Sequence, residues 1–193
     1  MLCSQQENKM SSITKGLEWL PRPLVLTTSE TARDILQDVY QYANEVSPDP
    51  NTKNGAVLVG PDGNVLTYGV NKFPTGVAAT ESRLTDKETK YRLVVHAENG
   101  AVFNAAKHGK MAQGATLYCP FYACSECAKA IIQGGIIRVV GHAQLMALAS
   151  EHTTWVKSIT DAWDVLHEAG VQCELYDGVV GVTTRFNGQD IPV

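Results

Sequence analysis

Two short motifs contain three side chains that can bind a transition metal and one carboxylate beside them. They are His96-x-Glu98 and Cys124-x-x-Cys127. The two cysteines are three residues apart at the start of a predicted helix, so their sulfur atoms face the same way. The partial positive charge of a helix N-terminus lowers the pKa of a thiol and favours the thiolate that a metal binds. The motifs therefore indicate metal chemistry.

One histidine and two cysteines make three protein ligands to Zn²⁺ and leave the fourth tetrahedral position open, as in catalytic zinc sites. Glu98 is close enough to His96 to reach a zinc-bound water without ligating the metal. We expect one zinc ion on His96, Cys124 and Cys127, with Glu98 as the catalytic group. Two alternatives stay open: a structural zinc site with a fourth ligand elsewhere, and a thioredoxin-like redox pair. The first normally has its histidine after the cysteine pair, and the second leaves His96 and Glu98 unexplained.

Composition limits the class of protein. The chain has 193 residues, of which 44% are hydrophobic and 19% charged, and its formal net charge is −4. These values are ordinary for a globular domain and unlike those of a disordered chain. A mildly acidic chain without a basic cluster does not favour nucleic acid as a partner.

The sequence shows no apolar run long enough to span a membrane and no secretory signal, so we expect a cytoplasmic protein. Five cysteines in such a chain do not indicate a disulfide framework. Of these, Cys119 and Cys173 lie in predicted strands and are expected in the core.

Apolar periodicity and turn signals predict alternating elements around the two motifs. Thr27 and Glu30 have the spacing of a capping box at the start of the first helix. The expected helices are 27–46, 93–107, 124–133 and 155–169, and the expected strands are 55–60, 65–70, 115–119, 136–140, 171–176 and, less regular, 179–186. This order predicts an α/β fold, a three-layer α/β/α sandwich with a mixed and mostly five-stranded central sheet.

The domain organisation follows from the same pattern. Residues 1–26 are polar and interrupted by prolines, and we interpret them as an N-terminal arm. Residues 27–193 are expected to form a single domain, with a catalytic core at about 51–177. The segment 179–193 has no assigned role.

The chain resembles the cytidine and deoxycytidylate deaminase superfamily, and its deoxycytidylate deaminase branch in particular. The resemblance covers about 51–177. Its most specific part is the combination of His96-Ala97-Glu98 with the two cysteines. Zinc deaminases share the signature H-x-E followed by P-C-x-x-C. It implies the cytidine-deaminase fold and one zinc ion per chain. The other segments that carry it are Gly55-Ala-Val-Leu-Val, 69–76, Tyr91-Arg-Leu-Val-Val, 114–118, 128–136 and Glu168-Ala-Gly-Val171.

The resemblance also implies contacts to a nucleotide. Asn71 is expected at the sugar, and Ala97, Tyr122 and Ala123 at the edge of the base through their main chains. Candidates for a phosphate are Ser125 and, as phosphate or allosteric contacts, Lys72 and Lys129. The chain departs from the family pattern at two positions: Ala123 stands where proline usually precedes the first cysteine, and Gly100 stands where asparagine usually follows the catalytic glutamate.

The function that the resemblance implies is hydrolysis of a free pyrimidine nucleotide, most of all dCMP to dUMP and ammonia. Zinc-bound hydroxide would attack C4 while Glu98 shuttles protons. One alternative is a related substrate, such as C5-modified dCMP, CMP or cytidine. Another is a catalytically silent regulatory or scaffold protein with this fold. The family further implies a homo-oligomer and dCTP and dTTP as effectors.

Several remaining residues have a structural interpretation. The stripe formed by Trp155, Ile159, Trp163 and Leu166 is expected to pack in the core and not to serve as a stacking platform. The other histidines are expected at the surface or at helix ends: His108, His142, His152 and His167.

Overall fold

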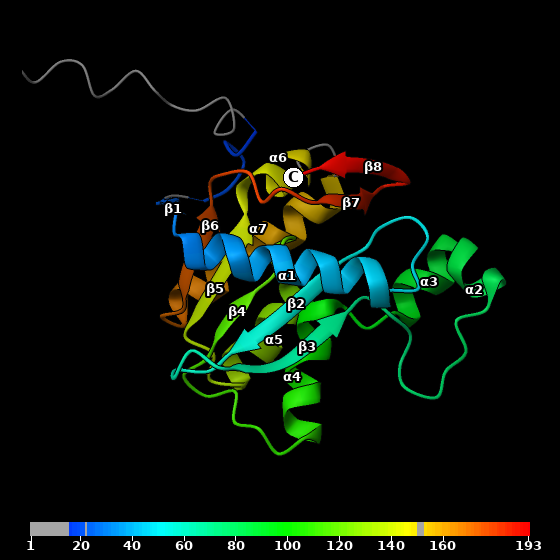
Figure 1. Cartoon of the computed structure of the whole chain (residues 1–193), viewed down its shortest axis with the longest axis horizontal. Coiled ribbons are helices and arrows are strands. Elements are labelled where there is room, and N and C mark those ends of the chain that lie inside the picture. The colour runs from blue at the N-terminus through cyan, green and yellow to red at the C-terminus, as the bar shows by residue number, and fades with distance from the viewer. Residues whose placement is uncertain (1–15, 22, 150–152) are drawn as a thin grey trace, which may run out of the picture.

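A six-stranded mixed sheet forms the centre of the molecule (Figure 1). In this computed structural model, residues 16–21, 23–149 and 153–193 are described. The strand order is β1-β6-β5-β4-β2-β3. The bounds of the six strands are β1 Val25–Thr27, β2 Gly55–Val59, β3 Val65–Val70, β4 Thr116–Tyr118, β5 Arg138–His142 and β6 Gln172–Tyr176.

Strand direction divides this sheet into two parts. β2 pairs antiparallel with both β3 and β4, whereas β4, β5, β6 and β1 run parallel to one another. The prediction of a mixed sheet is therefore confirmed, but it has six strands and not five. The extra strand is β1, in which Val25 pairs with Glu174. Most of β1 lies in the segment interpreted as an arm, and three residues are too few to show a strand period.

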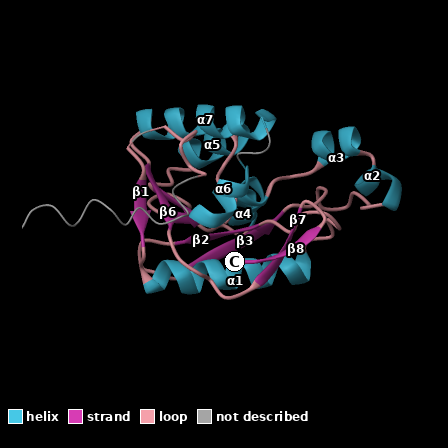
Figure 2. Cartoon of the chain, turned by 90° about the horizontal axis from the view of Figure 1, so that it is seen from above, coloured by secondary structure: helices cyan, strands magenta, loops and turns pink. Residues whose placement is uncertain are grey.

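Helices cover both faces of the sheet, which confirms the three-layer sandwich (Figure 2). α1 lies alone on one face, whereas α4, α5 and α7 cover the other. α2 and α3 lie to one side of these layers (Figure 2), whereas α6 follows β5 and is largely buried. The helix bounds are α1 Glu30–Val46, α2 Glu81–Thr85, α3 Lys87–Leu93, α4 Ala97–Lys107, α5 Ser125–Gln133, α6 Ala143–Ala149 and α7 Thr153–Glu168.

Three helix predictions need correction. α1 begins after Ser29, whose side chain accepts a hydrogen bond from the Ala32 amide, so the cap is not Thr27. α4 begins at Ala97 and not at residue 93, because the preceding valines are extended and Val95 forms a β-bridge with Lys72. Valine favours this conformation because its branched side chain is restricted in a helix. The loop expected at 71–88 contains α2, and α3 begins at its end.

The last residues form a separate β-hairpin of β7 (Thr183–Phe186) and β8 (Gln189–Pro192). The sequence pattern predicts only one strand here. The two residues of the hairpin turn, Asn187 and Gly188, have φ of 52° and 80°. Positive φ at both central residues defines the type I′ turn, and Asn-Gly is its preferred sequence. That dipeptide is the sequence signal that could have revealed this hairpin.

The buried core includes part of the segment interpreted as an arm. Leu17 and Leu20 are buried in the same hydrophobic cluster as α4, α5 and α7. Cys119 and Cys173 are buried as expected, and within the described residues neither forms a disulfide. Residues 1–15 lie outside the described part of the chain, and no helix of that part is long and apolar enough to span a bilayer.

The histidine predictions have mixed outcomes. His108 caps α4 as expected, and His167 bonds to the Trp163 carbonyl one turn earlier. His142 directly precedes α6, which agrees with a place at a helix end, but it is fully buried and not at the surface. Its Nδ1 lies 2.7 Å from the Tyr40 hydroxyl, and its Nε2 lies 3.0 Å from the Gly178 carbonyl. Desolvation lowers its pKa, which favours the neutral ring. His152 lies outside the described residues.

Gly69 fixes how closely α4 approaches β3. A Cβ atom added to Gly69 would lie 2.0 Å from the Ala97 carbonyl oxygen and 2.4 Å from the Ala101 amide nitrogen. Both are main-chain atoms of the helix that follows His96, so a side chain at residue 69 requires the helix to move. The absence of a side chain at Gly69 therefore helps to set the position of His96 and Glu98.

We expect Gly69→Ala to lower the free energy of unfolding by about 1–3 kcal/mol or more, the usual cost of overpacking. Chemical denaturation measures this. Gly100→Ala is the matched control, because its added Cβ would lie 3.5 Å from the nearest such atom, Gly69 Cα. In α4 this change should be neutral or stabilise by up to about 1 kcal/mol through helix propensity. Equal stabilities of the two variants would contradict the role given to Gly69.

Candidate active site and metal centre

The two motifs meet where α4 and α5 begin. His96 is the N-cap residue of α4, Cys124 is the N-cap residue of α5, and Cys127 lies in the first turn of α5. His96 Nδ1 is 3.2 Å from Cys124 Sγ and 3.5 Å from Cys127 Sγ, and the two sulfur atoms are 3.6 Å apart. The structure thus brings together all three predicted ligands.

These separations fit a tetrahedral zinc ion. With Zn–S bonds of about 2.3 Å and Zn–N bonds of about 2.0–2.1 Å, tetrahedral angles place two sulfurs about 3.8 Å apart and a sulfur and a nitrogen about 3.6 Å apart. The three distances between His96 Nδ1, Cys124 Sγ and Cys127 Sγ lie within a few tenths of an ångström of these values. Within the described residues these three form the group that can hold a metal ion. The donor set fits one zinc ion, with a fourth position left for a small molecule.

Without a metal, the three ligands share protons. The pKa of His96 is raised to about 9, first by its hydrogen bond to Cys124. The pKa of Cys124 is lowered to about 4 by hydrogen bonds from Cys127 and His96, and that of Cys127 is raised because it holds the proton that bonds to Cys124. The metal-free site therefore contains a thiolate, a thiol and an imidazolium. A zinc ion must displace the last two protons to bind.

Glu98 is the acidic group of the site. Only 3% of the residue is exposed, and its Oε2 lies 3.7 Å from Cys127 Sγ. Burial raises the pKa of its carboxyl group to about 7, despite the opposing charge of His96. A carboxyl group with this pKa exists in both protonation states near neutral pH, which suits proton transfer in both directions.

A cavity leads away from this cluster. Its inner end is formed by the metal ligands, Glu98 and aromatic side chains, and its outer end by polar side chains from several loops. The lining residues are Asp49, Thr52, Asn54, Asn71, Lys87, Lys90, Tyr91, Val94, His96, Glu98, Phe121, Tyr122, Cys124, Trp155, Phe186 and Asn187.

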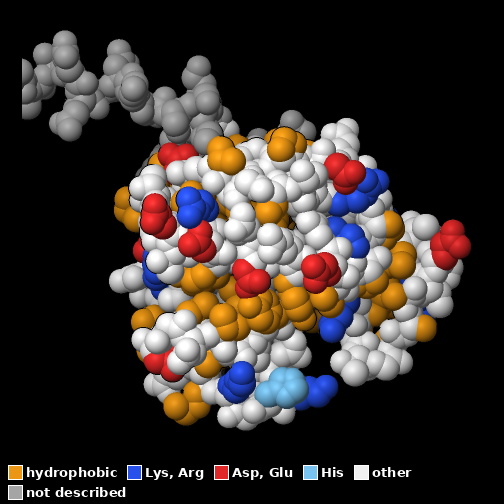
Figure 3. Space-filling model, in the orientation of Figure 1, with side chains coloured by type: hydrophobic (Ala, Val, Ile, Leu, Met, Phe, Trp, Pro, Cys, Tyr) orange, Lys and Arg blue, Asp and Glu red, His pale blue; other side chains and the backbone are white. Residues whose placement is uncertain are grey.

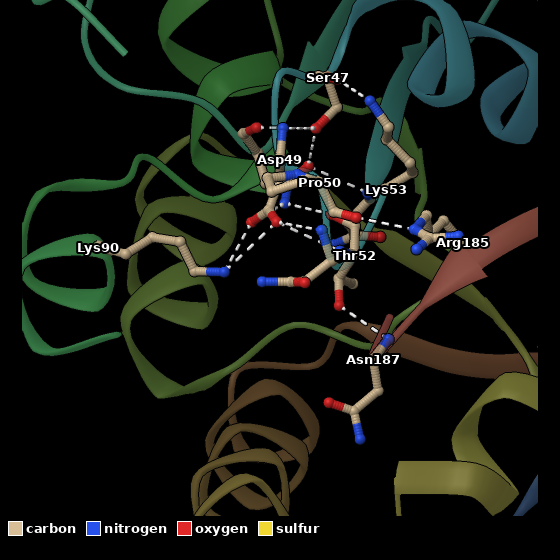
Figure 4. Close-up of polar contacts among 11 residues, drawn as sticks. Ser47, Asp49, Pro50, Thr52, Lys53, Lys90, Arg185 and Asn187 are labelled. Carbon is tan, nitrogen blue, oxygen red and sulfur yellow. Dashed lines mark hydrogen bonds and ion pairs between the residues drawn. The ribbon is translucent and has the colours of Figure 1, made fainter. Parts of the chain in front are cut away.

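Asp49 organises the outer end of the cavity (Figure 4). Its carboxylate pairs with Lys90 at 3.1 Å and accepts hydrogen bonds from the amides of Asn51 and Thr52. The side chains of Asp49 and Lys90 are only 7% and 9% exposed. A buried charge needs such a partner, because desolvation otherwise destabilises it strongly. This pair connects the loop before β2 to α3.

Asn71 lines the cavity, but its side chain is already engaged. Its Oδ1 accepts from the Asn54 amide and the Ser47 hydroxyl, and its Nδ2 donates to the Thr52 carbonyl and to Asp49. An asparagine amide offers two donors and two acceptor sites. Any side-chain contact from Asn71 to a sugar would therefore replace one of these bonds. The structure shows a residue that holds the loops around the cavity.

The other predicted contacts fall into two groups. Ala97, Tyr122 and Ala123 are buried beside the metal ligands, and Tyr122 lines the cavity. Ser125 begins α5, where its hydroxyl lies 3.0 Å from the Ser158 hydroxyl.

The two predicted lysine contacts are not among the residues that line the cavity. Lys129 pairs with Glu126 on the exposed side of α5, and Lys72 forms a main-chain bridge with Val95. In place of these two, the cavity has Lys87 and Lys90, which lie three residues apart on α3. The spacing of a helix predicts that residues three apart share a face, but the sequence shows no helix signal at 87–93.

The sequence pattern did not reveal the aromatic side chains that line the cavity. Trp155 packs against the core, as the helical stripe predicts, but it also lines the cavity, and its ring centroid lies 5.8 Å from that of His96 and 6.1 Å from that of Tyr91. Ile159, Trp163 and Leu166 are buried as predicted. Trp155 is in the first turn of α7, so it extends beyond the fully buried part of the stripe. Periodicity alone does not show that difference.

Sequence reasoning also missed the C-terminal hairpin as part of the site. Phe186 and Asn187 line the cavity from the hairpin tip. The rings of Phe186 and Phe121 lie 5.0 Å apart, which packs the hairpin against the segment before Cys124. The Asn-Gly turn signal could have revealed the hairpin but not its place beside the cavity.

Comparisons with known proteins agree with this geometry. Residues 29–143 match the model of the family described as "Cytidine and deoxycytidylate deaminase zinc-binding region". The chain is 35% identical to human deoxycytidylate deaminase over 102 residues, which is 49% of this chain and 54% of the human protein. It is 34% identical to deoxycytidylate deaminase of Enterobacteria phage T4 over 100 residues, 51% of this chain and 50% of the phage protein. The chain thus spans about half the length of these relatives.

A solved structure covers more of the fold. The dCMP deaminase of cyanophage S-TIM5, in a crystal structure in complex with dCMP and dUMP, is 26% identical with a TM-score of 0.56, over 77% of this chain and 99% of that one. The apo form of the same protein gives the same TM-score. The family match includes the three metal ligands and Glu98, since all four lie within residues 29–143. By the match to its zinc-binding region, the chain belongs to the cytidine and deoxycytidylate deaminase family.

Proposed function

We propose that this chain is a zinc-dependent deaminase that hydrolyses dCMP to dUMP and ammonia. The observation that carries the proposal is a buried carboxyl group, Glu98, beside three zinc ligands at the inner end of a cavity. The cyanophage protein, whose structure holds dCMP and dUMP, supports the choice of substrate. The polar outer end of the cavity supports a ligand larger than a free base.

The protein's own groups have separate roles in the reaction. His96, Cys124 and Cys127 hold the metal, which when bound lowers the pKa of water from 15.7 to about 7 and so supplies a nucleophile. Glu98 accepts a proton from the attacking water and delivers it to N3 of the pyrimidine. As the water oxygen adds to C4, Glu98 transfers the second proton to the amino group, and ammonia leaves. Trp155 and Phe121 offer aromatic faces to the base.

Some aspects of this proposal rest on the family alone. They are the homo-oligomeric state and the effectors dCTP and dTTP. A cytoplasmic location is part of the proposal and rests on the sequence pattern. Figure 3 supports a small-molecule substrate over a nucleic acid, since acidic and basic side chains are mixed on the face shown. A protein that follows a nucleic-acid backbone would present a basic surface instead.

Ammonia release from a substrate panel tests the proposal. We expect turnover of dCMP to exceed that of CMP, dCTP, 5-methyl-dCMP, deoxycytidine, cytidine and cytosine. Preference for another member of the panel would keep the mechanism and reassign the substrate. Stoichiometric zinc without turnover of any compound would contradict the enzyme assignment and favour the silent scaffold. The same assay with dTTP, with and without dCTP, tests the effectors.

Glu98→Gln should retain zinc and the fold but lower kcat by at least about 10²–10⁴, because the amide cannot carry the proton. Zinc content by atomic emission and kcat for dCMP, taken from one preparation, check this. Glu126→Gln is the matched control, since Glu126 lies on the exposed side of α5 and pairs with Lys129. A Glu98→Gln variant with near wild-type kcat would reject the assignment of Glu98.

Zinc binding to the metal-free protein should release at least two protons at pH 7.5, one from His96 and one from Cys127. The apparent affinity should rise with pH, and it should rise less steeply once His96 loses its proton, near its pKa of about 9, because Cys127 still holds its own. Calorimetry in buffers of different ionisation enthalpy counts the protons. Binding without proton release would show that the ligands are already deprotonated, contrary to this structure.

A further inference from the structure

The β7–β8 hairpin lies outside the region that matches the family, residues 29–143, yet its tip borders the cavity. It pairs with none of the six strands of the central sheet. Its contacts to the cavity are therefore a feature of this chain that the family match does not assign. The residue at the tip that faces the cavity with a polar side chain is Asn187.

Four hydrogen bonds fix the tip against the loop before β2. Arg185 Nε donates to the Pro50 carbonyl at 2.8 Å, and the Arg185 carbonyl accepts from the Lys53 amide at 2.9 Å. The Asn187 amide donates to Thr52 Oγ1 at 3.2 Å, and the Gly188 amide donates to the Asn51 carbonyl at 2.8 Å. These bonds lie on both sides of residue 187 and so fix the position of its main chain.

The side chain of Asn187 takes no part in this network. Figure 4 shows it pointing away from the bonded groups, whereas its main-chain nitrogen bonds to Thr52. Within the described residues, the Asn187 side-chain amide has no hydrogen-bond partner. The positive φ of 52° that the turn requires also directs this side chain. The result is an unused side-chain amide on a fixed main chain at the outer end of the cavity.

The charges at this end favour an anion. Asp49 is neutralised by Lys90, with which it forms a buried pair. Lys87 also lines the cavity and, among the described residues, has no acidic partner. The cavity that Asn187 lines therefore also has one lysine whose positive charge is not compensated by an acidic partner. The base of a nucleotide must reach the metal at the inner end in order to react. Its sugar and phosphate would then lie toward the outer end.

We propose that Asn187 is a substrate-binding residue whose side-chain NH₂ donates to the 5′-phosphate of the nucleotide, with Lys87 supplying charge. This rests on the proposed function for the choice of a nucleotide. The contact distinguishes a nucleoside monophosphate from a nucleoside, because a nucleoside has no group at that position. It gives the C-terminal hairpin a role in substrate specificity.

The turn itself provides two variants that preserve the backbone. Gly-Gly and Asp-Gly are, like Asn-Gly, preferred sequences of the type I′ turn. Asn187→Gly thus removes the side chain, and Asn187→Asp replaces the donor by a negative charge of the same shape. Gln189→Ala is the control, since Gln189 is exposed in the same hairpin and does not line the cavity. Thermal unfolding checks that all three variants keep the fold.

The test is the affinity of zinc-loaded protein for dUMP and for deoxyuridine, measured by calorimetry. Hydrogen bonds to charged groups are worth about 1.5–3 kcal/mol, so Asn187→Gly should weaken dUMP about 10- to 100-fold. Asn187→Asp should weaken dUMP further, by repulsion. Neither variant should change the affinity for deoxyuridine, and Gln189→Ala should change neither affinity.

Three outcomes would overturn the proposal: unchanged dUMP affinity in both variants, equal weakening of dUMP and deoxyuridine, or a wild-type protein that binds both equally. The second of these would place Asn187 at the sugar. Because the test measures binding and not turnover, its result is independent of whether the protein deaminates dCMP. Loss of dUMP affinity in Asn187→Gly without any turnover by the wild type would support this contact and reject the catalytic assignment.

Discussion

The approach of α4 to β3 is the constraint on which the site depends. At Gly69 the helix main chain lies where a side chain would otherwise be, so the start of α4 is fixed against the sheet. His96 and Glu98 lie at that start, and the two cysteines come from the next helix along. Distances between ligands within a few tenths of an ångström of those zinc needs require this kind of rigid support. A single absent methyl group thus contributes to the metal geometry.

Burial then gives the same residues their chemistry. The low-dielectric surroundings that raise the pKa of Glu98 also strengthen the interaction between His96 and Cys124. Burial and hydrogen bonding therefore act differently on neighbouring groups. Burial keeps the Glu98 carboxyl group titratable near neutral pH, whereas hydrogen bonds from Cys127 and His96 outweigh burial and leave Cys124 as a thiolate ready for a metal. The cavity provides access to both without exposing either to bulk water.

The sequence is sufficient to predict the fold class and the metal centre, because both depend on local signals. Helix and strand periods predict the alternation, and the spacing of His96, Glu98 and the cysteines predicts the ligands. The rest of the cavity depends on contacts distant in sequence. Trp155 looks like a core residue because it continues a helical stripe, and Lys90 gives no sign of its buried partner Asp49. Single-sequence patterns carry no information on such pairs.

The contacts of the hairpin and those among the metal ligands differ in the length of chain that they enclose. The metal ligands are 28 and 31 residues apart, whereas the bonds that hold the hairpin tip to Pro50 and Thr52 join residues 135 apart. Loop-closure entropy grows with the length enclosed, and exposed hydrogen bonds open at low free energy. Release of Arg185 and Asn187 would open the outer end of the cavity while the metal ligands stay in place. Opening at the hairpin and integrity of the metal site are therefore separable in this fold.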